Sequence, residues 1–401
     1  MTKLTLRRGK EESLLRRHPW IFSGAIHSTD GTPEEGDVVD VYTSTGEFIA
    51  RGHCAIGSIA VRVLTFDAEE AIDNRFWERR IAEAYGVRKT LGLTDSTNTT
   101  CYRLVHGEGD NLPGLVVDIY GTTAVMQSHS VGMYLARHEI AAALRSVYGA
   151  RLTAVYDKSA GTIPPKCGIE AVDGYLWQET ANAHPDTVVW EGGNRFQANW
   201  EDGQKTGFFI DQRDNRALVG RYARGRRVLN TFCYTGGFSV YAMQGGATAV
   251  DSVDSSARAV ALASENMKLN RSVAVEGFAH QEIASDTLEF IRRMPENAYD
   301  LVILDPPAFA KHHKVLGNAL QGYKRLNAAA LGKMPAGSIL FTFSCSQAVS
   351  REQFRMAVFS AAAIAGRRVR ILHQLTQPAD HPVNIYHPEG EYLKGLVLYV
   401  E

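Results

Sequence analysis

From about residue 227 to its end, the chain alternates between short apolar or β-branched runs and longer segments of helical character. This alternation is typical of a doubly wound, largely parallel α/β sheet with helices on both faces. The expected strands are 227–231, 248–253, 274–279, 300–304, 338–343, 368–374 and 394–400. Helices are expected from 237 and at 256–269, 284–293, 318–333 and 350–364. Ligands of such a sheet bind at the carboxyl ends of its strands, so a site is expected along that edge.

Two smaller domains are expected before this one, over residues 1–70 and 71–187. The first has short strand patterns separated by Gly-containing turns, which predict a small β-barrel; the strands are 20–23, 37–42, 48–52 and 59–64. The second mixes strand and helix patterns, including helices at 74–91 and 134–148, and predicts a small α+β domain that shapes the substrate site. A hairpin with a Gly192-Gly193-Asn194 turn opens the third domain, 188–401.

Composition excludes several classes of protein. The 401 residues are 45% hydrophobic and 22% charged with a net charge of -1, and no apolar run reaches the roughly 18 residues of a membrane-spanning helix. The basic N-terminus leads into no long apolar core, so a secretory signal is not expected. A cytoplasmic location is expected instead. The five cysteines form no C-x-x-C pair, which argues against a zinc site or a disulfide framework; no metal is expected.

The first twenty residues carry a local excess of positive charge, with six Lys or Arg against two Glu. Such a cluster can hold a polyanion through contacts to phosphates, although from charge alone a solvated surface is the simpler interpretation. The candidate RNA-binding residues in it are Arg7, Arg8, Lys10, Arg16, Arg17 and His18.

The segment Val228–Ser239 has the pattern of a strand, a glycine loop and a helix. It lacks both G-x-G-x-x-G and G-x-x-x-x-G-K-[ST], which disfavours a dinucleotide, and with it a nicotinamide dehydrogenase, and also a nucleoside triphosphate. A nucleoside cofactor without a long phosphate chain is therefore expected. The candidate cofactor-binding residues of the loop are Phe232, Tyr234, Thr235, Gly236 and Gly237.

Acidic residues follow the next two expected strands. Asp254, with Ser255 beside it, comes where such folds place an acceptor for ribose hydroxyls, although Asp254 or Ser255 also suits the N-cap of the following helix. Asp286 is a candidate partner of an adenine amino group or, equally, a plain acidic residue in the first turn of a helix.

Two further strand ends carry residues suited to chemistry on a nucleobase. Asp305-Pro306-Pro307, followed by Phe309 and Lys311, forms a rigid turn that presents an acceptor to a base flipped out of its stack, although Asp-Pro-Pro is also a common turn. Cys345 follows the expected strand 338–343 and would lie beside this turn. Position separates it from Cys54, Cys101 and Cys167, which are expected to be buried bystanders, and from Cys233, which is expected to line the pocket.

In order and spacing, these motifs resemble the class I S-adenosylmethionine-dependent methyltransferases. Residues 7–25, 36–39 and 50–52 resemble the RNA-binding PUA domain over about seventy residues. With 203–214, 379–383 and 388–395 included, the whole chain resembles the bacterial 23S rRNA cytosine-C5 methyltransferases that carry an N-terminal PUA domain. The resemblance implies a Rossmann-like domain with a seven-stranded, mostly parallel sheet, S-adenosylmethionine as cofactor and 23S rRNA as partner. The chain departs from many RNA cytosine-C5 methyltransferases because Asp305 is followed by Pro-Pro rather than Pro-Cys.

By this resemblance, Cys345 is the nucleophile that adds to C6 of a cytosine, Asp305 holds or protonates the N3 edge, and Phe309 or Tyr323 stacks on the base. A thiol has an ordinary pKa of about 8.5, so a cation or proton acceptor beside Cys345 is implied. Two alternatives stay open: an RNA methyltransferase acting on a purine amine or ring nitrogen, and a non-catalytic rRNA-binding assembly factor. Four questions also stay open: which group is the general base, which cytosine is modified, whether the substrate is naked rRNA or an early precursor particle, and whether the protein forms a homodimer.

Overall fold

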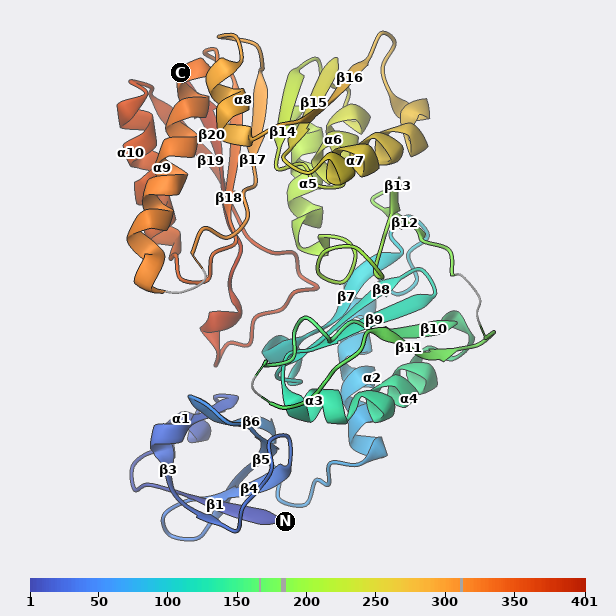
Figure 1. Cartoon of the computed structure of the whole chain (residues 1–401), viewed down its shortest axis with the longest axis vertical. Helices are drawn as coiled ribbons and strands as arrows, with labels where there is room; N and C mark the ends of the chain where they lie inside the picture. The colour runs from blue at the N-terminus through green and yellow to red at the C-terminus, as the bar shows by residue number, and fades with distance from the viewer. Residues whose placement is uncertain (166, 182–184, 311–312) are drawn as a thin grey trace. The chain divides into compact units, whose positions relative to one another are not determined.

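The computed structural model describes residues 1–165, 167–181, 185–310 and 313–401. The chain divides into two compact units (Figure 1). The first unit comprises Met1–Val189, Ala198–Ile210 and Ala379–Gly390, and the second comprises Trp190–Gln197, Asp211–Pro378 and Glu391–Glu401. One short segment from the middle of the chain and one from near its end thus belong to the first unit. The three-domain boundaries expected from the sequence stay a prediction.

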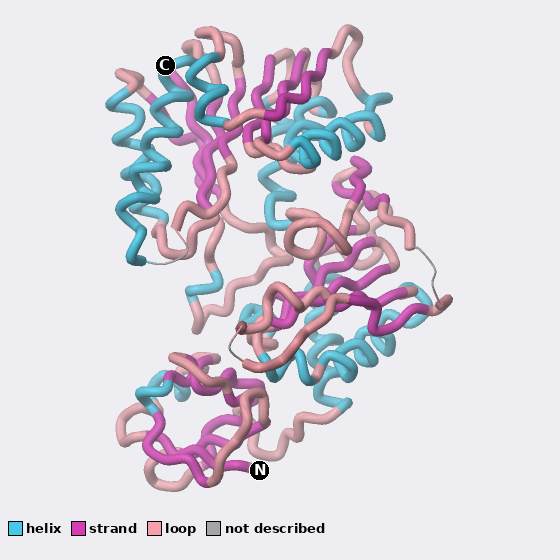
Figure 2. The backbone as a smooth tube through the Cα atoms, viewed as in Figure 1, coloured by secondary structure: helices cyan, strands magenta, loops and turns pink. Residues whose placement is uncertain are grey.

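The N-terminal part of the first unit is a mostly antiparallel sheet in the order β2-β6-β5-β4-β1-β3, which curls on itself (Figure 2). Its buried side chains, such as Leu6, Val39 and Val61, form a core of their own. The four expected strands are confirmed, whereas β1 and β3 were not expected. The elements are β1 (Thr2–Leu6), α1 (Glu12–Leu15), β2 (Trp20–Phe22), β3 (Ile26–Asp30), β4 (Val38–Tyr42), β5 (Phe48–Cys54) and β6 (Ile59–Thr65).

The other sheet of the first unit has the order β11-β10-β9-β8-β7, and the helices α2 and α4 pack together beside it. One expected helix is divided at Ala136, and its first part is capped by Ser130, whose Oγ accepts a hydrogen bond from Met133 N. The elements are α2 (Asn74–Thr90), β7 (Cys101–His106), β8 (Leu115–Tyr120), β9 (Thr123–Ser128), α3 (Val131–Leu135), α4 (Arg137–Tyr148), β10 (Ala154–Asp157) and β11 (Gly174–Gln178). The expected hairpin is also present, as β12 (Val188–Glu191) and β13 (Asn194–Gln197).

The second unit is built on a sheet of seven strands within the described residues, in the order β16-β15-β14-β17-β18-β20-β19. The five strands from β16 to β18 are parallel, and β20 is antiparallel to both of its neighbours. The expected doubly wound, mostly parallel sheet is therefore confirmed. The strands are β14 (Arg227–Thr231), β15 (Ala249–Asp254), β16 (Ala279–Ala284), β17 (Leu301–Leu304), β18 (Ile339–Ser344), β19 (Val369–Leu375) and β20 (Lys394–Val400).

The expected strand at 274–279 is wrong, because β16 begins only at Ala279. The apolar residues before it lie in a short helical turn and a bend in which Gly277 has φ 75°. The true strand has a polar sequence, Ala-His-Gln-Glu-Ile-Ala, because it is an edge strand with four exposed side chains. A search for apolar runs therefore finds the wrong segment.

Helices lie on both faces of this sheet (Figure 1). The helices α8, α9 and α10 share one apolar core with β17, β18 and β20, while α5 contacts α6 and α6 contacts α7. The helices are α5 (Arg213–Tyr222), α6 (Gly237–Gln244), α7 (Ala257–Leu269), α8 (Thr287–Arg293), α9 (Leu316–Lys333) and α10 (Arg351–Ile364). Only α5 was not expected.

The register of the parallel strands brings their carboxyl ends to one level. Thr231, near the end of β14, is paired with both Val253 of β15 and Leu304 of β17, and Leu304 is paired with Thr342 of β18. The loops that follow these strands therefore share one edge of the sheet. The chain leaves β14 in one direction toward β15 and later returns to its other side at β17, so β14 marks the topological switch point where such sheets bind ligands.

Candidate active site

The glycine loop after β14 is held in an unusual backbone conformation. Phe232, Tyr234 and Gly236 all have positive φ angles, of 53°, 46° and 75°. A Cβ added at Gly236 would lie 2.8 Å from the Cβ of Ala263, so this position requires glycine for space as well as for conformation. Such strained loops persist only when their surroundings hold them, and they cluster at ligand sites.

Two hydrogen bonds hold this loop from neighbouring elements. The backbone N–H of Tyr234 donates to Asp254 Oδ2 at 3.0 Å, and Asn266 Nδ2 of α7 donates to the Thr235 carbonyl at 2.8 Å. Thr235, Gly236 and Gly237 are buried, whereas Phe232 and Tyr234 are half-buried. The loop is therefore connected to both the end of β15 and α7.

Asp254 does not cap the helix that follows it. The cap of α7 is Ser256, whose side chain accepts a hydrogen bond from Ala259 N at 3.2 Å, so the expectation of a cap at Asp254 or Ser255 is wrong. The Asp254 carboxylate instead accepts from Tyr234 N and Ser256 N, at 3.0 and 2.9 Å, and Ser255 is exposed. A carboxylate has about four lone-pair sites, so these two bonds leave acceptor capacity for ribose hydroxyls.

Asp286 is the N-cap of α8, and its Oδ1 accepts a hydrogen bond from Glu289 N at 2.8 Å. Asp286 therefore has a helical role, but as the N-cap and not as a residue of the first turn. The side chain is exposed just past β16, so a contact with adenine stays a prediction.

The turn after β17 orients its carboxylate through a relay of amides. Gln212 Nε2 donates to Asp305 Oδ2 at 3.0 Å, and Asn215 Nδ2 donates to Gln212 Oε1 at 2.6 Å. Pro306 is buried, whereas Pro307 and Phe309 are exposed. Gln212 lies far from Asp305 in the sequence, and sequence reasoning assigned no role to it. Its place in the motif 203–214 was the only signal that pointed to one.

Tyr323 belongs to the scaffold, and the expectation that it stacks on a base is wrong. It is 0% exposed, and its hydroxyl is hydrogen-bonded to Ser344 Oγ and to Ser346 Oγ, both at 2.9 Å. Phe309 packs near its ring, with the centroids 4.7 Å apart, and keeps 36% of its surface exposed. Phe309 therefore stays the candidate stacking residue.

Cys345 follows β18 directly and lies against the turn after β17. Its Sγ is 3.9 Å from the Pro306 carbonyl oxygen, and Ala310 N donates to Ser346 Oγ at 3.2 Å. The side chain is half-buried. The structure therefore brings Cys345 beside the residue that follows Asp305, as the sequence predicts.

Cys233, in the glycine loop, has a different environment. It is 6% exposed, and burial raises the pKa of its thiol, with the nearby Asp254 carboxylate raising it further. A thiol that stays protonated is a poor nucleophile, so Cys233 is not equivalent to Cys345.

The polar groups at this edge of the sheet fit S-adenosylmethionine. Acceptors for hydroxyl and amino groups are present at Asp254, Asp286 and Asp305, and the glycine loop offers no long phosphate cradle. Over the residues that the structure describes, no group of three or more His, Cys, Asp or Glu side chains is arranged to hold a metal ion. None of the helices searched in that part of the chain is long and apolar enough to cross a membrane.

The basic residues near the N-terminus lie mostly on the surface. Arg7, Arg8, Lys10, Arg16 and Arg17 are exposed. Arg16 pairs with Glu12 at 3.1 Å, and Arg7 Nε donates to the Ile26 carbonyl. His18 is half-buried, and its Nδ1 accepts from Trp20 N at 3.1 Å. Lys311, also expected to contact substrate, lies outside the described residues.

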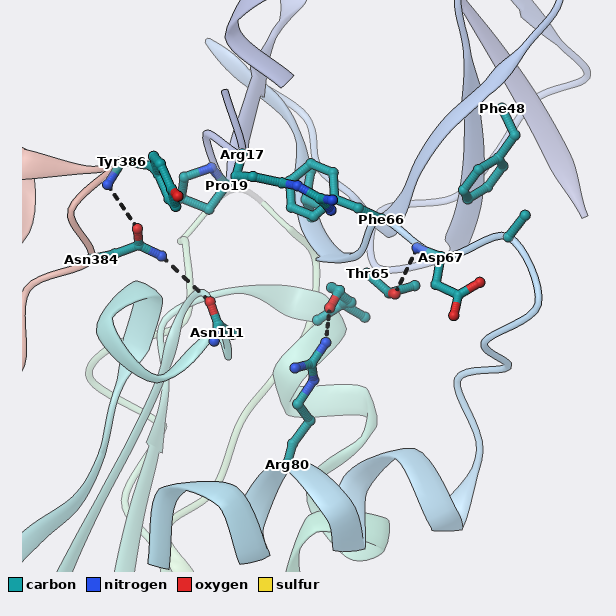
Figure 3. A pocket seen from close by; sticks show the side chains of 13 residues that line it. Arg17, Pro19, Phe48, Thr65, Phe66, Asp67, Arg80, Asn111, Asn384 and Tyr386 are labelled. Carbon is teal, nitrogen blue, oxygen red and sulfur yellow. Dashed lines mark hydrogen bonds between the residues drawn. The ribbon is translucent and has the colours of Figure 1, made fainter. Parts of the chain in front are cut away.

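A cavity of about 650 Å³ lies within the first unit (Figure 3). The guanidinium of Arg17 lies 4.9 Å from the ring centroid of Phe66, and Asn384 Nδ2 is 3.4 Å from Asn111 Oδ1. Tyr386, also on its wall, is 52% exposed. Guanidinium, aromatic and amide groups are the side chains that stack on and hydrogen-bond unpaired RNA bases. Of the six candidate RNA-binding residues, only Arg17 lines this cavity.

Two families match this chain in the order that the sequence predicts. Residues 4–66 match the PUA-like domain, and residues 175–382 match the S-adenosylmethionine-dependent methyltransferases. A putative SAM-dependent methyltransferase from Streptococcus mutans has the same fold, with a TM-score of 0.82 at 24% identity over 99% of this chain and 100% of that one. Another structure with the same values is of a putative methyltransferase complexed with SAH.

Curated relatives match over their full length. A protein of Tolumonas auensis named ribosomal RNA large subunit methyltransferase I is 42% identical over 99% of both chains. The protein of the same name from Escherichia coli strain SMS-3-5 is 37% identical, again over 99% of both. Together with the PUA-like domain and the glycine loop at the switch point, these matches show that the chain belongs to the ribosomal RNA large subunit methyltransferase I family, a family of S-adenosylmethionine-dependent methyltransferases.

Proposed function

We propose that this protein methylates carbon 5 of a cytosine in large-subunit ribosomal RNA, with Cys345 as the nucleophile. The names of the curated relatives support the RNA class. The contact of Cys345 Sγ with the turn that carries Asp305 carries the choice of chemistry, because C5 methylation needs a thiol beside a base-binding acceptor, whereas methylation of an amine does not.

Carbon 5 of cytosine is a weak nucleophile until the C5–C6 double bond is activated. The Cys345 thiolate would add to C6, forming a C–S bond and moving the electron pair of the double bond toward C5. Once C5 carries the methyl group that a bound cofactor would supply, a base would take the C5 proton, the C5–C6 double bond would re-form, and the C–S bond would break to return the thiolate. The base has to be water or a side chain not yet assigned.

The side chains around Cys345 would hold the cytosine for this addition. Asp305, oriented by Gln212, would hold a proton at N3 of the ring, which stabilises the negative charge that the addition pushes into it. Phe309 and Pro307 are exposed on the same turn and offer apolar surface to a flipped base.

Residues of the glycine loop, with Asp254, Ser255 and Asp286, would hold the cofactor at the other strand ends. When bound, S-adenosylmethionine supplies the methyl group from its sulfonium. The positive φ angles of the loop allow backbone N–H groups to approach a ligand closely.

The first unit would bind the parts of the RNA that flank the reacting base. The exposed residues Arg7, Arg8, Lys10 and Arg16 would contact phosphates, and Arg17 with His18 would lead toward the cavity of the first unit. The identification of 23S rRNA, either naked or in an early precursor particle, stays part of this proposal, as do the three-domain division, a homodimer and a cytoplasmic location.

The test uses protein-free 23S rRNA, labelled S-adenosylmethionine and mass spectrometry of the digested nucleosides. We expect 5-methylcytidine from the wild-type protein and none from Cys345→Ala. In the same assay, RNA carrying 5-fluorocytidine should form a covalent adduct with the wild-type protein but not with Cys345→Ala. Fluorine cannot leave C5 as a cation, so the C–S bond persists.

Other outcomes would overturn this function. A methylated purine, together with full activity of Cys345→Ala, would assign the protein to amine or ring-nitrogen methylation. RNA binding without any binding of S-adenosylmethionine in calorimetry would instead support the non-catalytic assembly factor.

A further inference from the structure

Lys394, on β20, lies opposite the end of the strand that leads to Cys345. In the antiparallel pairing of β18 with β20, it is the partner of Ser344, so the two side chains lie on the same face of the sheet. Lys394 is only 5% exposed, which is unusual for a lysine. A buried ammonium needs compensating partners, so its surroundings should account for its position.

The ammonium contacts the turn that begins with Cys345. Lys394 Nζ donates to the Ser346 carbonyl at 2.6 Å and to the Val349 carbonyl at 2.8 Å. Both acceptors lie within four residues after Cys345 in the chain. The positive charge is therefore fixed against the turn that begins with Cys345.

The electrostatics of this cluster connect the two groups. Burial lowers the pKa of Lys394 to about 8, and attraction to the Cys345 thiolate opposes this shift. The other charges that act on Lys394 are Arg351 of α10, which lowers its pKa, and Glu391, which raises it. At pH 7 the group therefore remains mainly protonated, and it loses its charge as the pH rises through about 8.

The negative charge of Cys345 also acts on Tyr323 of α9. Burial raises the pKa of Tyr323, and the negative charge of Cys345 adds to this effect, while the hydrogen bonds between the Tyr323 hydroxyl and the side chains of Ser344 and Ser346 oppose it. Tyr323 is therefore neutral near pH 7, whereas Lys394 is a buried cation that interacts electrostatically with Cys345.

We propose that Lys394 is a positioning residue that stabilises the thiolate form of Cys345 and fixes the turn that carries it. This role rests on the proposed function, in which Cys345 is the nucleophile. The two carbonyl acceptors favour the protonated amine, so Lys394 acts as a fixed cation and not as the base that removes the C5 proton.

The experiment measures how fast iodoacetamide alkylates Cys345 in the full-length protein between pH 6 and pH 10, with the modified peptide quantified by mass spectrometry. The neutral variants are Lys394→Met, of similar length, and Lys394→Gln, which keeps an N–H donor. The matched control is Lys333→Met, at the far end of α9, and Lys394→Arg restores the charge. Thermal unfolding of each variant reports whether it is folded.

We expect both neutral variants to raise the midpoint pH of alkylation by at least about one unit, which slows the reaction roughly tenfold at pH 7. Lys333→Met should leave the profile unchanged, and Lys394→Arg should move it back toward the wild type. An unchanged midpoint in a folded neutral variant would overturn the proposal. If both variants unfold, a wild-type midpoint at or above about 8.5 would overturn it equally.

This readout separates the role of Lys394 from the proposed function, because alkylation needs neither RNA nor cofactor. A midpoint that depends on Lys394 while Cys345→Ala keeps full methyl transfer would overturn cytosine-C5 chemistry alone. A midpoint independent of Lys394, together with a covalent adduct on 5-fluorocytidine RNA, would overturn the role of Lys394 alone.

Discussion

Two loops at the same edge of the sheet each carry a cysteine, and they differ in what surrounds the sulfur. Cys233, after β14, is buried beside the Asp254 carboxylate, and both effects raise its pKa. Cys345, after β18, is half-buried, and the turn that it begins accepts two hydrogen bonds from a buried ammonium. Burial and the sign of the neighbouring charge, not position at the edge alone, therefore decide which thiol is suited to nucleophilic chemistry.

The largest expected difference between the two loops is in catalysis. Cys345→Ser should reduce methyl transfer to rRNA by about 1,000-fold or more, because a hydroxyl is a far weaker nucleophile than a thiolate. Cys233→Ser should change the rate less than tenfold. Single-turnover assays at saturating cofactor measure both, and comparable losses in the two variants would refute the distinction.

Removal of the amide that orients Asp305 should have an intermediate effect. A hydrogen bond to a charged group contributes about 1.5–3 kcal/mol, so Gln212→Ala should lower kcat for methyl transfer by roughly 10- to 100-fold. Cofactor affinity, measured by calorimetry, should stay within a few-fold. Gln281→Ala, at an exposed position on β16, is the control, and a pure loss of cofactor affinity in Gln212→Ala would contradict this role.

The thiols should also differ in their reactivity without substrate. A raised pKa means that Cys233 remains protonated above the pH at which an ordinary thiol ionises, so its alkylation by iodoacetamide should stay slow through pH 9. Cys345 should react at least about tenfold faster at pH 8. Peptide mapping after timed alkylation tests this, and faster labelling of Cys233 in folded protein would reverse the assignment.

The last prediction concerns the stability of the protein and not its reactivity, through the backbone of the glycine loop. Gly236→Ala should destabilise the protein by about 1–3 kcal/mol, because alanine is strained at φ 75° and its Cβ would meet Ala263. Gly225→Ala is a matched control with φ 71° and open space around the new Cβ. Denaturant unfolding should show a smaller loss in the control, and equal losses would mean that packing against Ala263 contributes nothing.

Local sequence patterns determined most of the secondary structure of the second unit. The alternation of apolar and helical segments predicted β14, β15, β17, β18, β19 and β20, because each of these strands carries apolar or β-branched residues. It failed at β16, where an edge strand exposes polar residues and so hides the pattern. Resemblance to a known family, more than periodicity, identified the cofactor and the RNA class.

Only the tertiary structure decided which residues surround the thiol. Gln212 precedes the first strand of the sheet and Lys394 begins the last, yet one contacts Asp305 and the other the turn at Cys345. Strand order brings them together, because β20 enters antiparallel beside β18 and places Lys394 opposite Ser344. Charge interactions of this kind depend on distance in space, which neighbours in the sequence do not reveal. The sequence by itself therefore identified a cysteine at the carboxyl edge of the sheet, and the fold placed a buried cation against the turn that begins with it.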